Sequence, residues 1–466
     1  MHPMLHRTRL VALLTAVATL VGLSALAAIP TSAAGPVIAL SPKSGHPTAP
    51  VQVTGTGFGV SEAVAIAFDA AAVASASTDS AGAFSASLTV PKSALPGLHQ
   101  VTATGQTSFL SATAAFTVRT DWRQFRLGQR HTGYNPYENV LSPSNVSGLH
   151  VKWTRAIGAG STSSPAVVNG TVYVGSYGGN LYALNALTGA VRWTAATGVI
   201  SRSSPAVANG VVYVGYEFGK VYAVNAWTGA VLWTRATGGM IESSPTVANG
   251  VVYIGSDDGK VYALNASTGQ VKWAVTTGPV ESSPAVADGV VYVGSWDKKL
   301  YALRASTGAV LWTATTGGGI DSSPAVVRPG LVYVGSTDNK LYALNASTGA
   351  VKWTMTAAYG VESSPAVANG VVYVAAGDNK LYALNAWTGA VLWTTLGGFE
   401  SSSPAVANGV VYVGSNDNKV YALDALTGAV LWTSAPTGYI IASSPAVADG
   451  VVYVTSEDGK VYAFGL

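Results

Sequence analysis

The residues that could do chemistry stand just before a recurring tripeptide, Ser-Ser-Pro. In chain order this position holds Thr162, Arg202, Glu242, Glu281, Asp321, Glu362, Ser401 and Ala442, with Glu400 one residue ahead of its register. Carboxylates that converge raise one another's pKa or recruit a cation, so the pattern predicts a Ca²⁺ site or a site for a basic or sugar ligand. The competing interpretation, which we favour, is a solvated rim that hydrogen-bonds the neighbouring connections, because structural carboxylates also cluster. Arg202 is expected to pair with Glu242.

Aromatic residues mark a second set of variable positions, in polar turns of the same repeats. Tyr177, Tyr216, Phe218 and Trp296 stand where the other repeats hold Ser, Asp or Asn. Exposed rings near acids suit stacking against a sugar or a peptide. Packing against the rest of the chain explains them equally well, since Tyr and Trp also serve such contacts.

Several chemistries lack the residues they need. The chain has no cysteine, and no histidine follows His150. This excludes a Ser-His-Asp triad, a histidine or thiolate metal site and a disulfide from the repeats. Acidic turns such as Asp257-Asp258-Gly259 lack the alternating ligands of an EF-hand loop, so we interpret them as turns in which Asp caps the backbone. Whether the repeats bind a metal ion through carboxylates is left open by the sequence.

The elements that must position these residues form a long internal repeat. The proline of Ser-Ser-Pro recurs at Pro165, Pro205, Pro245, Pro284, Pro324, Pro365, Pro404 and Pro445. Within a repeat, an Asn-Gly or Asp-Gly turn, a polar turn and a Thr-Gly turn separate four apolar runs, which predicts a four-stranded antiparallel meander. Radial packing of the meanders closes the array and leaves few edges. The predicted fold is all-β, with an eight-bladed β-propeller over residues 149–466.

Tryptophans end the fourth run of the repeat and set its place in each blade. They are Trp153, Trp193, Trp233, Trp273, Trp312, Trp353, Trp393 and Trp432, spaced 39 to 41 residues apart. Because the Ser-Ser-Pro run is made of small residues, we place it at the crowded axis and the tryptophan run outside. Trp153 precedes the first Ser-Ser-Pro, and the last repeat ends at Leu466 without a tryptophan. A strand over residues 151–154 should therefore complete the last blade.

Three segments precede the repeats. Residues 1–34 combine basic residues, an apolar run and small residues, which is typical of a cleaved secretory signal, with an uncleaved anchor as the alternative. Residues 36–119 show short alternating runs broken by Gly and Pro, which predicts a small β-sandwich. Residues 120–148 are polar with several aromatics, and we expect a connector packed on the propeller. These segments predict a secreted, extracellular or cell-envelope monomer without a membrane span after cleavage.

The nearly balanced charge of the chain argues against nucleic acid as a partner. Without Arg7 and Arg9 of the signal, 23 basic and 22 acidic residues remain. A net charge near +1 carries no electrostatic footprint for a polyanion.

Two parts of the sequence resemble known families. The segment Ala183-Leu184-Asn185-Ala186-Leu187-Thr188-Gly189-Ala190-Val191-Arg192-Trp193 resembles the tryptophan-docking motif of quinoprotein (PQQ-type) propellers, and seven copies stand in register. The resemblance implies that the tryptophans wedge between neighbouring blades, and that PQQ with Ca²⁺ is a possible cofactor pair. Ser41-Pro42-Lys43-Ser44-Gly45 and Val53-Thr54-Gly55-Thr56-Gly57-Phe58 resemble immunoglobulin-like domains of the IPT/TIG kind.

The sequence departs from the enzymatic members of that first family. Their adjacent cysteine pair and long insertions are missing, and Arg304 replaces the usual acid or amide. A related non-catalytic group, which assists outer-membrane protein assembly, shares the compact repeats, but its lipid-bearing cysteine is missing.

We therefore expect no cofactor and rank first a secreted non-catalytic binding or scaffolding propeller. Its protein, peptide or carbohydrate ligand would be bound by the loop face around the central funnel. The alternatives are a PQQ- and Ca²⁺-dependent alcohol or sugar dehydrogenase and a cell-wall carbohydrate-binding protein.

Overall fold

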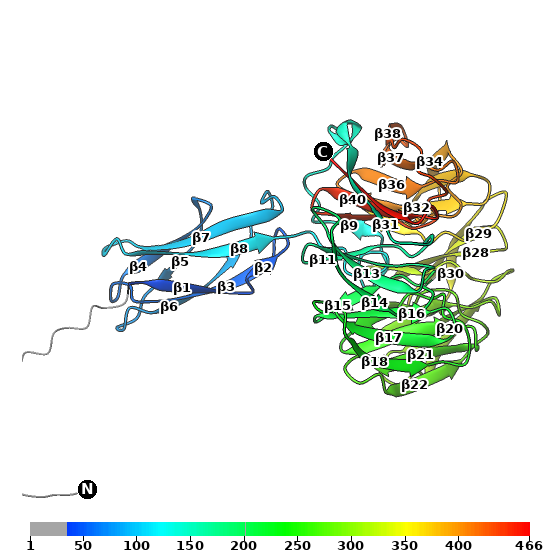
Figure 1. The fold of residues 1–466 in the computed structure, drawn as a ribbon, viewed down its shortest axis with the longest axis horizontal. Helices are drawn as coiled ribbons and strands as arrows, with labels where there is room; N and C mark the ends of the chain where they lie inside the picture. The colour runs from blue at the N-terminus through cyan, green and yellow to red at the C-terminus, as the bar shows by residue number, and fades with distance from the viewer. Residues whose placement is uncertain (1–34, 201) are drawn as a thin grey trace, which may run out of the picture.

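Strands make up almost all of the regular structure, and they form two bodies (Figure 1). The computed structural model describes residues 35–200 and 202–466, so the predicted signal over residues 1–34 lies outside the described residues. Within these two ranges, the one helical element is a 3-10 turn, η1 (Val146–Gly148). No helix there is long and apolar enough to cross a membrane.

The smaller body is a β-sandwich. Its strands are β1 (Val37–Ser41), β2 (Ser44–Gly45), β3 (Pro50–Thr56), β4 (Ala63–Phe68), β5 (Ala71–Ser77), β6 (Phe84–Thr89), β7 (Gly97–Gly105) and β8 (Ser111–Val118). One sheet has the order β1-β3-β6 and the other β2-β8-β7-β4-β5. Every second residue of β3 is buried, and the inward side chains of both sheets form one core around Val53, Ile66 and Phe116. Period-two alternation over these short runs is what a half-buried strand requires.

The larger body consists, within the described ranges, of eight sheets with four strands of the repeat each. The innermost strands are β11 (Ala166–Val168), β15 (Ala206–Ala208), β19 (Thr246–Ala248), β23 (Ala285–Ala287), β27 (Ala325–Val327), β31 (Ala366–Ala368), β35 (Ala405–Ala407) and β39 (Ala446–Ala448). The second strands are β12 (Thr171–Gly175), β16 (Val211–Tyr216), β20 (Val251–Ser256), β24 (Val290–Gly294), β28 (Leu331–Ser336), β32 (Val371–Ala376), β36 (Val410–Gly414) and β40 (Val451–Ser456).

The third strands are β13 (Asn180–Asn185), β17 (Lys220–Asn225), β21 (Lys260–Asn265), β25 (Lys299–Arg304), β29 (Lys340–Asn345), β33 (Lys380–Asn385), β37 (Val420–Asp424) and β41 (Lys460–Gly465). The outer strands are β14 (Val191–Ala196), β18 (Val231–Ala236), β22 (Val271–Thr276), β26 (Val310–Thr315), β30 (Val351–Thr356), β34 (Val391–Leu396), β38 (Val430–Thr433) and β10 (His150–Ala156). The small-residue strands contact one another around the axis. Side-chain volume therefore sorts the strands by radius, as the sequence predicts.

Neighbouring blades are joined by the tryptophans of the outer strands. Seven indole Nε1 groups donate to an alanine carbonyl of the next blade at 2.9 to 3.2 Å; the donors are Trp153, Trp193, Trp233, Trp273, Trp312, Trp353 and Trp393. Each ring also covers the glycine of the next Thr-Gly turn; a Cβ added to Gly189 would lie 2.5 Å from the Trp153 ring. The contact needs glycine because any side chain there would occupy the seat of the indole.

The ring closes without a covalent link. Strand β10 pairs antiparallel with β41, so the outer strand of the last blade comes from the N-terminal side of the repeats. Trp153 of this strand then donates to Ala186 of the first blade. Trp432 differs from the other seven, because the last blade ends without a Thr-Gly turn: its ring lies edge-on to Phe464, with ring centroids 5.3 Å apart.

The connector runs once around the propeller axis. Residues 122–135 contact the eight innermost strands in turn, with hydrogen bonds of 2.6 to 3.1 Å. Seven of these bonds come from the backbone N–H of the valine that follows Ser-Ser-Pro-Ala, or Ser-Ser-Pro-Thr in the third repeat. In the eighth blade Asn135 donates its side-chain amide to Val447 O instead. The short strand β9 (Tyr134–Asn135) pairs in parallel with β35 of the seventh blade. The connector thus closes one end of the central channel.

Two buried residues, Arg126 and a neutral His131, hold the middle of this connector against the propeller. Arg126 is 1% exposed and donates to Pro404 O at 2.5 Å. The His131 ring contacts the Thr246 hydroxyl at 2.7 Å, and burial lowers the pKa of His131 to about 3, with the Arg126 charge adding to the effect. Thr246 is the one innermost strand residue of its register that is not alanine. The pair therefore fixes which blade the histidine faces.

We expect Thr246→Val to lower the free energy of unfolding by about 1–2 kcal/mol, because the buried neutral imidazole would lose the hydroxyl that it contacts. Urea denaturation measures the change. Thr246→Ser keeps the hydroxyl and should retain most of the stability; equal losses in the two variants would contradict a role for the hydrogen bond.

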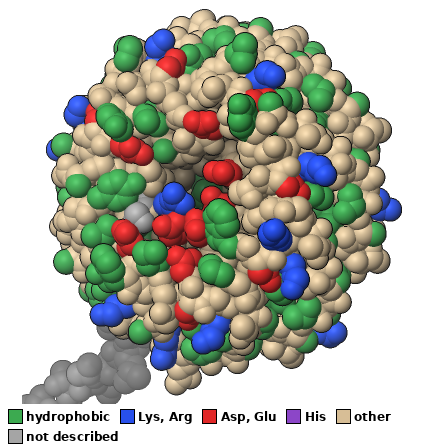
Figure 2. Space-filling model, turned by 90° about the vertical axis from the view of Figure 1, so that its right-hand side faces the viewer, with side chains coloured by type: hydrophobic (Ala, Val, Ile, Leu, Met, Phe, Trp, Pro, Cys, Tyr) green, Lys and Arg blue, Asp and Glu red, His purple; other side chains and the backbone are tan. Residues whose placement is uncertain are grey.

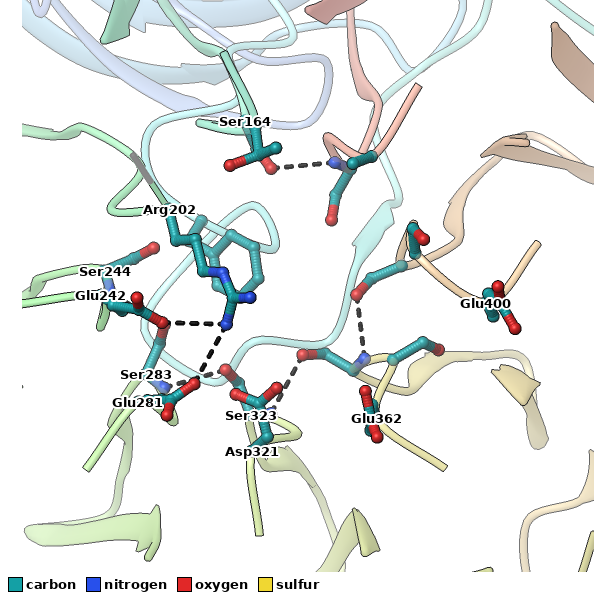
Figure 3. A pocket seen from close by; sticks show the side chains of 18 of the residues that line it. Ser164, Arg202, Glu242, Ser244, Glu281, Ser283, Asp321, Ser323, Glu362 and Glu400 are labelled. Atoms are coloured by element: carbon teal, nitrogen blue, oxygen red, sulfur yellow. Dashed lines mark hydrogen bonds and ion pairs between the residues drawn. The ribbon is translucent and has the colours of Figure 1, made fainter. Parts of the chain in front are cut away.

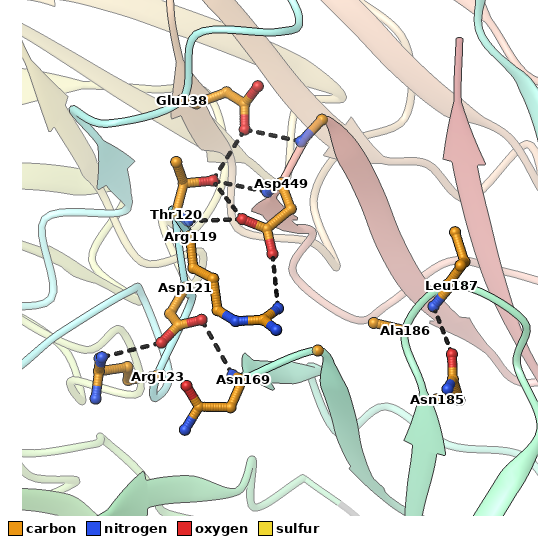
Figure 4. Close-up of polar contacts among 12 residues, drawn as sticks. Arg119, Thr120, Asp121, Arg123, Glu138, Asn169, Asn185, Ala186, Leu187 and Asp449 are labelled. Carbon is orange, nitrogen blue, oxygen red and sulfur yellow. Dashed lines mark hydrogen bonds and ion pairs between the residues drawn. The ribbon is translucent and has the colours of Figure 1, made fainter. Parts of the chain in front are cut away.

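The sandwich is tied to the last blade by a polar junction (Figure 4). The backbone N–H of Thr120 donates to Asp449 Oδ1 at 2.6 Å, and the backbone N–H of Asp449 donates to Thr120 Oγ1 at 2.7 Å. Glu138 of the connector accepts from the N–H of Gly450 at 3.1 Å. Burial raises the pKa of Asp449, with the Thr120 amide acting in the opposite sense. This reciprocal network fixes the chain where the sandwich ends and the connector begins.

Candidate functional site

A hollow of about 670 Å³ opens at the centre of the propeller on the face turned away from the sandwich. Acidic side chains and one basic side chain gather around it (Figure 2). Phe125 of the connector is part of its lining, since the connector closes the other end of the channel. We call this hollow the funnel. Its location follows from the meander, because the start of each innermost strand and the second turn of each blade lie on the same face.

The two serines of Ser-Ser-Pro build the wall of the funnel. The first serine accepts a hydrogen bond from the second strand of its own blade, as Ser203 does from Gly215 N at 2.9 Å. The second serines bond one another across blades: the N–H of Ser164 donates to Ser204 Oγ, and seven such bonds of 2.9 to 3.0 Å link the eight residues. These serines are structural, which agrees with the lack of a base beside them.

Carboxyl groups form the rim of the funnel (Figure 3). All six charged residues singled out from the sequence line it: Arg202, Glu242, Glu281, Asp321, Glu362 and Glu400. Arg202 donates through Nη1 to Glu242 Oε2 at 2.9 Å and to Glu281 Oε2 at 3.0 Å. The expected Arg202–Glu242 pair is present, and Glu281 shares the same guanidinium nitrogen. Glu400 accepts from the Asn416 side chain at 2.7 Å.

One guanidinium does not offset the crowding of these acids. Burial raises the pKa of Glu281 to about 8, with further contributions from Asp321 and Glu242, while Arg202 acts in the opposite sense. Burial also raises the pKa of Asp321 to about 6, again opposed by Arg202. Protons therefore stay on part of the rim near neutral pH, and a cation entering the funnel would displace them.

The aromatic residues divide between the funnel and the outer loops. Tyr177 lines the funnel, and its hydroxyl contacts Thr162 Oγ1 at 3.1 Å. Tyr216 stacks at a tilt on Phe218, with centroids 5.4 Å apart, and Trp296 lies against Gly319. These last three are outside the funnel lining, because their turns carry the rings toward neighbouring loops.

Three aromatic or acidic residues of the lining were missed at the sequence level: Phe125, Tyr359 and Glu457. Tyr359 is 65% exposed and stands in a connection where four of the eight repeats hold glycine. Glu457 lies in the second turn of the last blade, and acidic residues are common in the second turns of the other repeats. Tyr359 alone carried a signal that a comparison of the repeats could have detected.

The repeats match a family model described as outer membrane protein assembly factor BamB (PQQ_2). The matches cover residues 146–216, 198–324, 301–401 and 395–465, which together are more than half of the chain. The chain belongs to this family. No curated protein is similar enough in sequence to match this BamB-family chain.

Solved structures share the propeller fold of this BamB-family protein. BamB from Moraxella catarrhalis has 21% sequence identity and a TM-score of 0.60, over 68% of this chain and 100% of that one. A europium-containing methanol dehydrogenase has 17% identity and a TM-score of 0.66, over 74% and 98%. Quinohemoprotein alcohol dehydrogenase from Comamonas testosteroni has 17% identity and a TM-score of 0.65, over 74% and 80%. One fold thus serves different functions, and the site must decide between them.

The funnel of this BamB-family propeller does not fit PQQ. PQQ bears carboxylate groups of its own, whereas the lining offers six carboxyl groups and a single guanidinium. The carboxylates of PQQ and those of the lining would repel one another strongly in a partly buried site. Across residues 35–200 and 202–466, no three His, Asp or Glu side chains are grouped so that they could hold a metal ion. The charges of the lining therefore do not suit the quinone cofactor.

Proposed function

We propose that this BamB-family chain is a secreted, non-catalytic binding propeller whose funnel receives a positively charged segment of a protein or peptide. One observation carries the proposal: six carboxyl groups face a common hollow with one guanidinium among them. Secretion rests on the signal-like residues 1–34 of the sequence. The family description, an assembly factor, is consistent with a protein as the ligand.

The distribution of charge around the rim supports a cationic ligand. Arg202 serves Glu242 and Glu281 on one side. On the other side, Glu362 and Glu400 have no ion-pair partner among the residues that the structure describes. A lysine or arginine side chain of a ligand would pair with Glu362 and Glu400 as Arg202 pairs with Glu242 and Glu281. In a partly desolvated site such ion pairs contribute more binding free energy than on an open surface.

The apolar part of the lining suits the same ligand. Phe125 provides an apolar surface for the methylene stem of a long basic side chain. Tyr177 and Tyr359 offer ring faces to a guanidinium or to the peptide backbone. A volume of about 670 Å³ accommodates a short peptide segment rather than a lone ion.

Calorimetric titration with a Lys/Arg-rich peptide and an acidic peptide of equal length tests the proposal. We expect only the basic peptide to bind, more weakly as salt increases. The double substitution Glu281→Gln/Asp321→Asn should weaken binding by about tenfold or more. Glu217→Gln, a matched neutralisation on the same face outside the lining, should leave it unchanged. Equal binding of both peptides, or oxidation of alcohols at an enzyme-like rate after loading with PQQ and Ca²⁺, would overturn the proposal.

A further inference from the structure

A second hollow, of about 240 Å³, lies between the first two blades. Its lining comes from the connector, the ends of β11, β12 and β15 with their Asn-Gly turns, the outer strand β14 and the turn that carries Trp227. It therefore opens on the face opposite to the funnel mouth. Among the described residues, its lining shares no member with that of the funnel. The side chains that give it chemical character are Arg123, Arg192, Trp227, Asn169 and Asn209.

The charge of this interblade hollow is the reverse of that of the funnel. No Asp or Glu of residues 35–200 and 202–466 lines it. Arg123 is paired with Asp121 at 2.9 Å, and Asp121 also accepts from Asn169 N at 3.1 Å (Figure 4). Arg192 donates to the Gly170 carbonyl at 3.1 Å and has no carboxylate partner within the described part of the chain. One guanidinium is therefore left to bind an anion.

Arg192 is specific to this place in the ring. The same register of the other seven outer strands holds Lys152, Leu232, Lys272, Leu311, Lys352, Leu392 and Leu431. Four repeats hold leucine here, so the blade does not need a charged residue in this register. A guanidinium differs from lysine in presenting a planar fork that can bind both oxygens of a carboxylate. The fold therefore does not require an arginine in this register, and the Arg192 guanidinium can serve a ligand instead.

Trp227 adds a fixed aromatic surface at the edge of the hollow. Its side chain is 71% exposed, yet the ring rests on the Asn209-Gly210 turn, where an added Cβ at Gly210 would lie 2.0 Å from ring carbon Cη2. Three repeats hold serine in this register, at Ser267, Ser306 and Ser347. An indole that is exposed, held in place and not required by the blade is well suited to stack on the apolar face of a sugar ring.

We propose that the interblade hollow binds an acidic saccharide, with the sugar ring on Trp227 and its carboxylate on Arg192. The side-chain amides of Asn169 and Asn209 lie in the same lining and can both donate to and accept from sugar hydroxyls. This inference does not depend on what the funnel binds, because the two sites share no described residue and lie on opposite faces.

Titration of the full protein with an oligomer of galacturonic acid tests the inference, with a neutral galactose oligomer and inorganic phosphate as comparison probes. We expect the uronic acid oligomer to bind and each comparison probe to bind at least about tenfold more weakly. Equal binding of the neutral oligomer would show that the carboxylate is not recognised. Equal binding of phosphate would show a site for anions in general. Either result would overturn the proposal.

Two variants taken from other repeats test the residues without disturbing the fold. Arg192→Leu and Trp227→Ser each install the residue that other blades carry in that register, so both should unfold like the parent. We expect each to weaken binding of the uronic acid oligomer by about tenfold. Trp387→Ser is the control, since that tryptophan is also exposed but does not rest on its turn glycine, Gly370. Unchanged binding in both test variants, or an equal loss in the control, would refute the assignment.

Discussion

Trp153→Ala is expected to lower the free energy of unfolding by about 3–5 kcal/mol, the usual cost of emptying a tryptophan site in a packed core. The indole is 9% exposed and donates to Ala186 O at 2.9 Å. It also covers Gly189 and lies 6.0 Å from the Tyr453 ring, centroid to centroid. Alanine would remove all of these contacts from the seam at which the two ends of the ring meet.

The seam makes this loss different from the same substitution elsewhere. In Trp233→Ala the outer strand β18 stays joined to β17 of its own blade by the Thr-Gly turn, whereas β10, which carries Trp153, is held to the last blade by its pairing with β41 and not by a turn. We expect similar changes in equilibrium stability, but faster amide exchange in β10 and β41 in the Trp153 variant alone. Denaturant unfolding and native-state hydrogen exchange measure the two effects. The exposed Trp387, replaced by serine, should change stability by no more than about 0.5 kcal/mol. Unfolding of the Trp153 variant at parental denaturant concentrations would refute the closure.

The repeat explains why so much of the fold could be predicted from the sequence. Turn residues, small residues at the axis and the spacing of the tryptophans are local signals, and each is repeated in every blade. The position before Ser-Ser-Pro lies at the start of an innermost strand, so the prediction that Arg202 and the carboxylates share one rim followed from topology.

Features that occur once could not be predicted in the same way. The connector runs around the axis and is held mostly by backbone hydrogen bonds to the innermost strands. Such bonds leave no pattern of residue types in the sequence. Trp432 departs from the other tryptophans because the blade it faces lacks a Thr-Gly turn. Tyr216, Phe218 and Trp296 lie outside the funnel because the direction of a side chain within a polar turn depends on backbone angles that the sequence does not specify.

The acidic rim leads to a second large effect, in which neutralising a carboxyl group stabilises the free protein. Glu281 has a pKa of about 8 in the folded protein and an ordinary value of 4.5. Between these values the folded state keeps a proton that the unfolded state has released, so stability falls as the pH rises from about 4.5 to about 8. The cost is fully present above pH 8 and absent below the ordinary pKa. This pH dependence of stability has the opposite sign to that of a carboxylate stabilised by an ion pair.

We therefore expect Glu281→Gln to raise the free energy of unfolding at pH 8.5 by roughly 2 kcal/mol, allowing for partial solvent access to the rim. At pH 5 the folded parent is itself protonated at this position, so the gain should nearly vanish. Urea denaturation across this pH range measures the difference, and Glu217→Gln controls for the change in net charge. Parallel pH profiles for the parent and the Glu281 variant would contradict the electrostatic strain. If the variant is more stable but binds the basic peptide less well, the protein keeps its carboxylates at a cost in stability, and the rim is maintained for a ligand rather than for the fold.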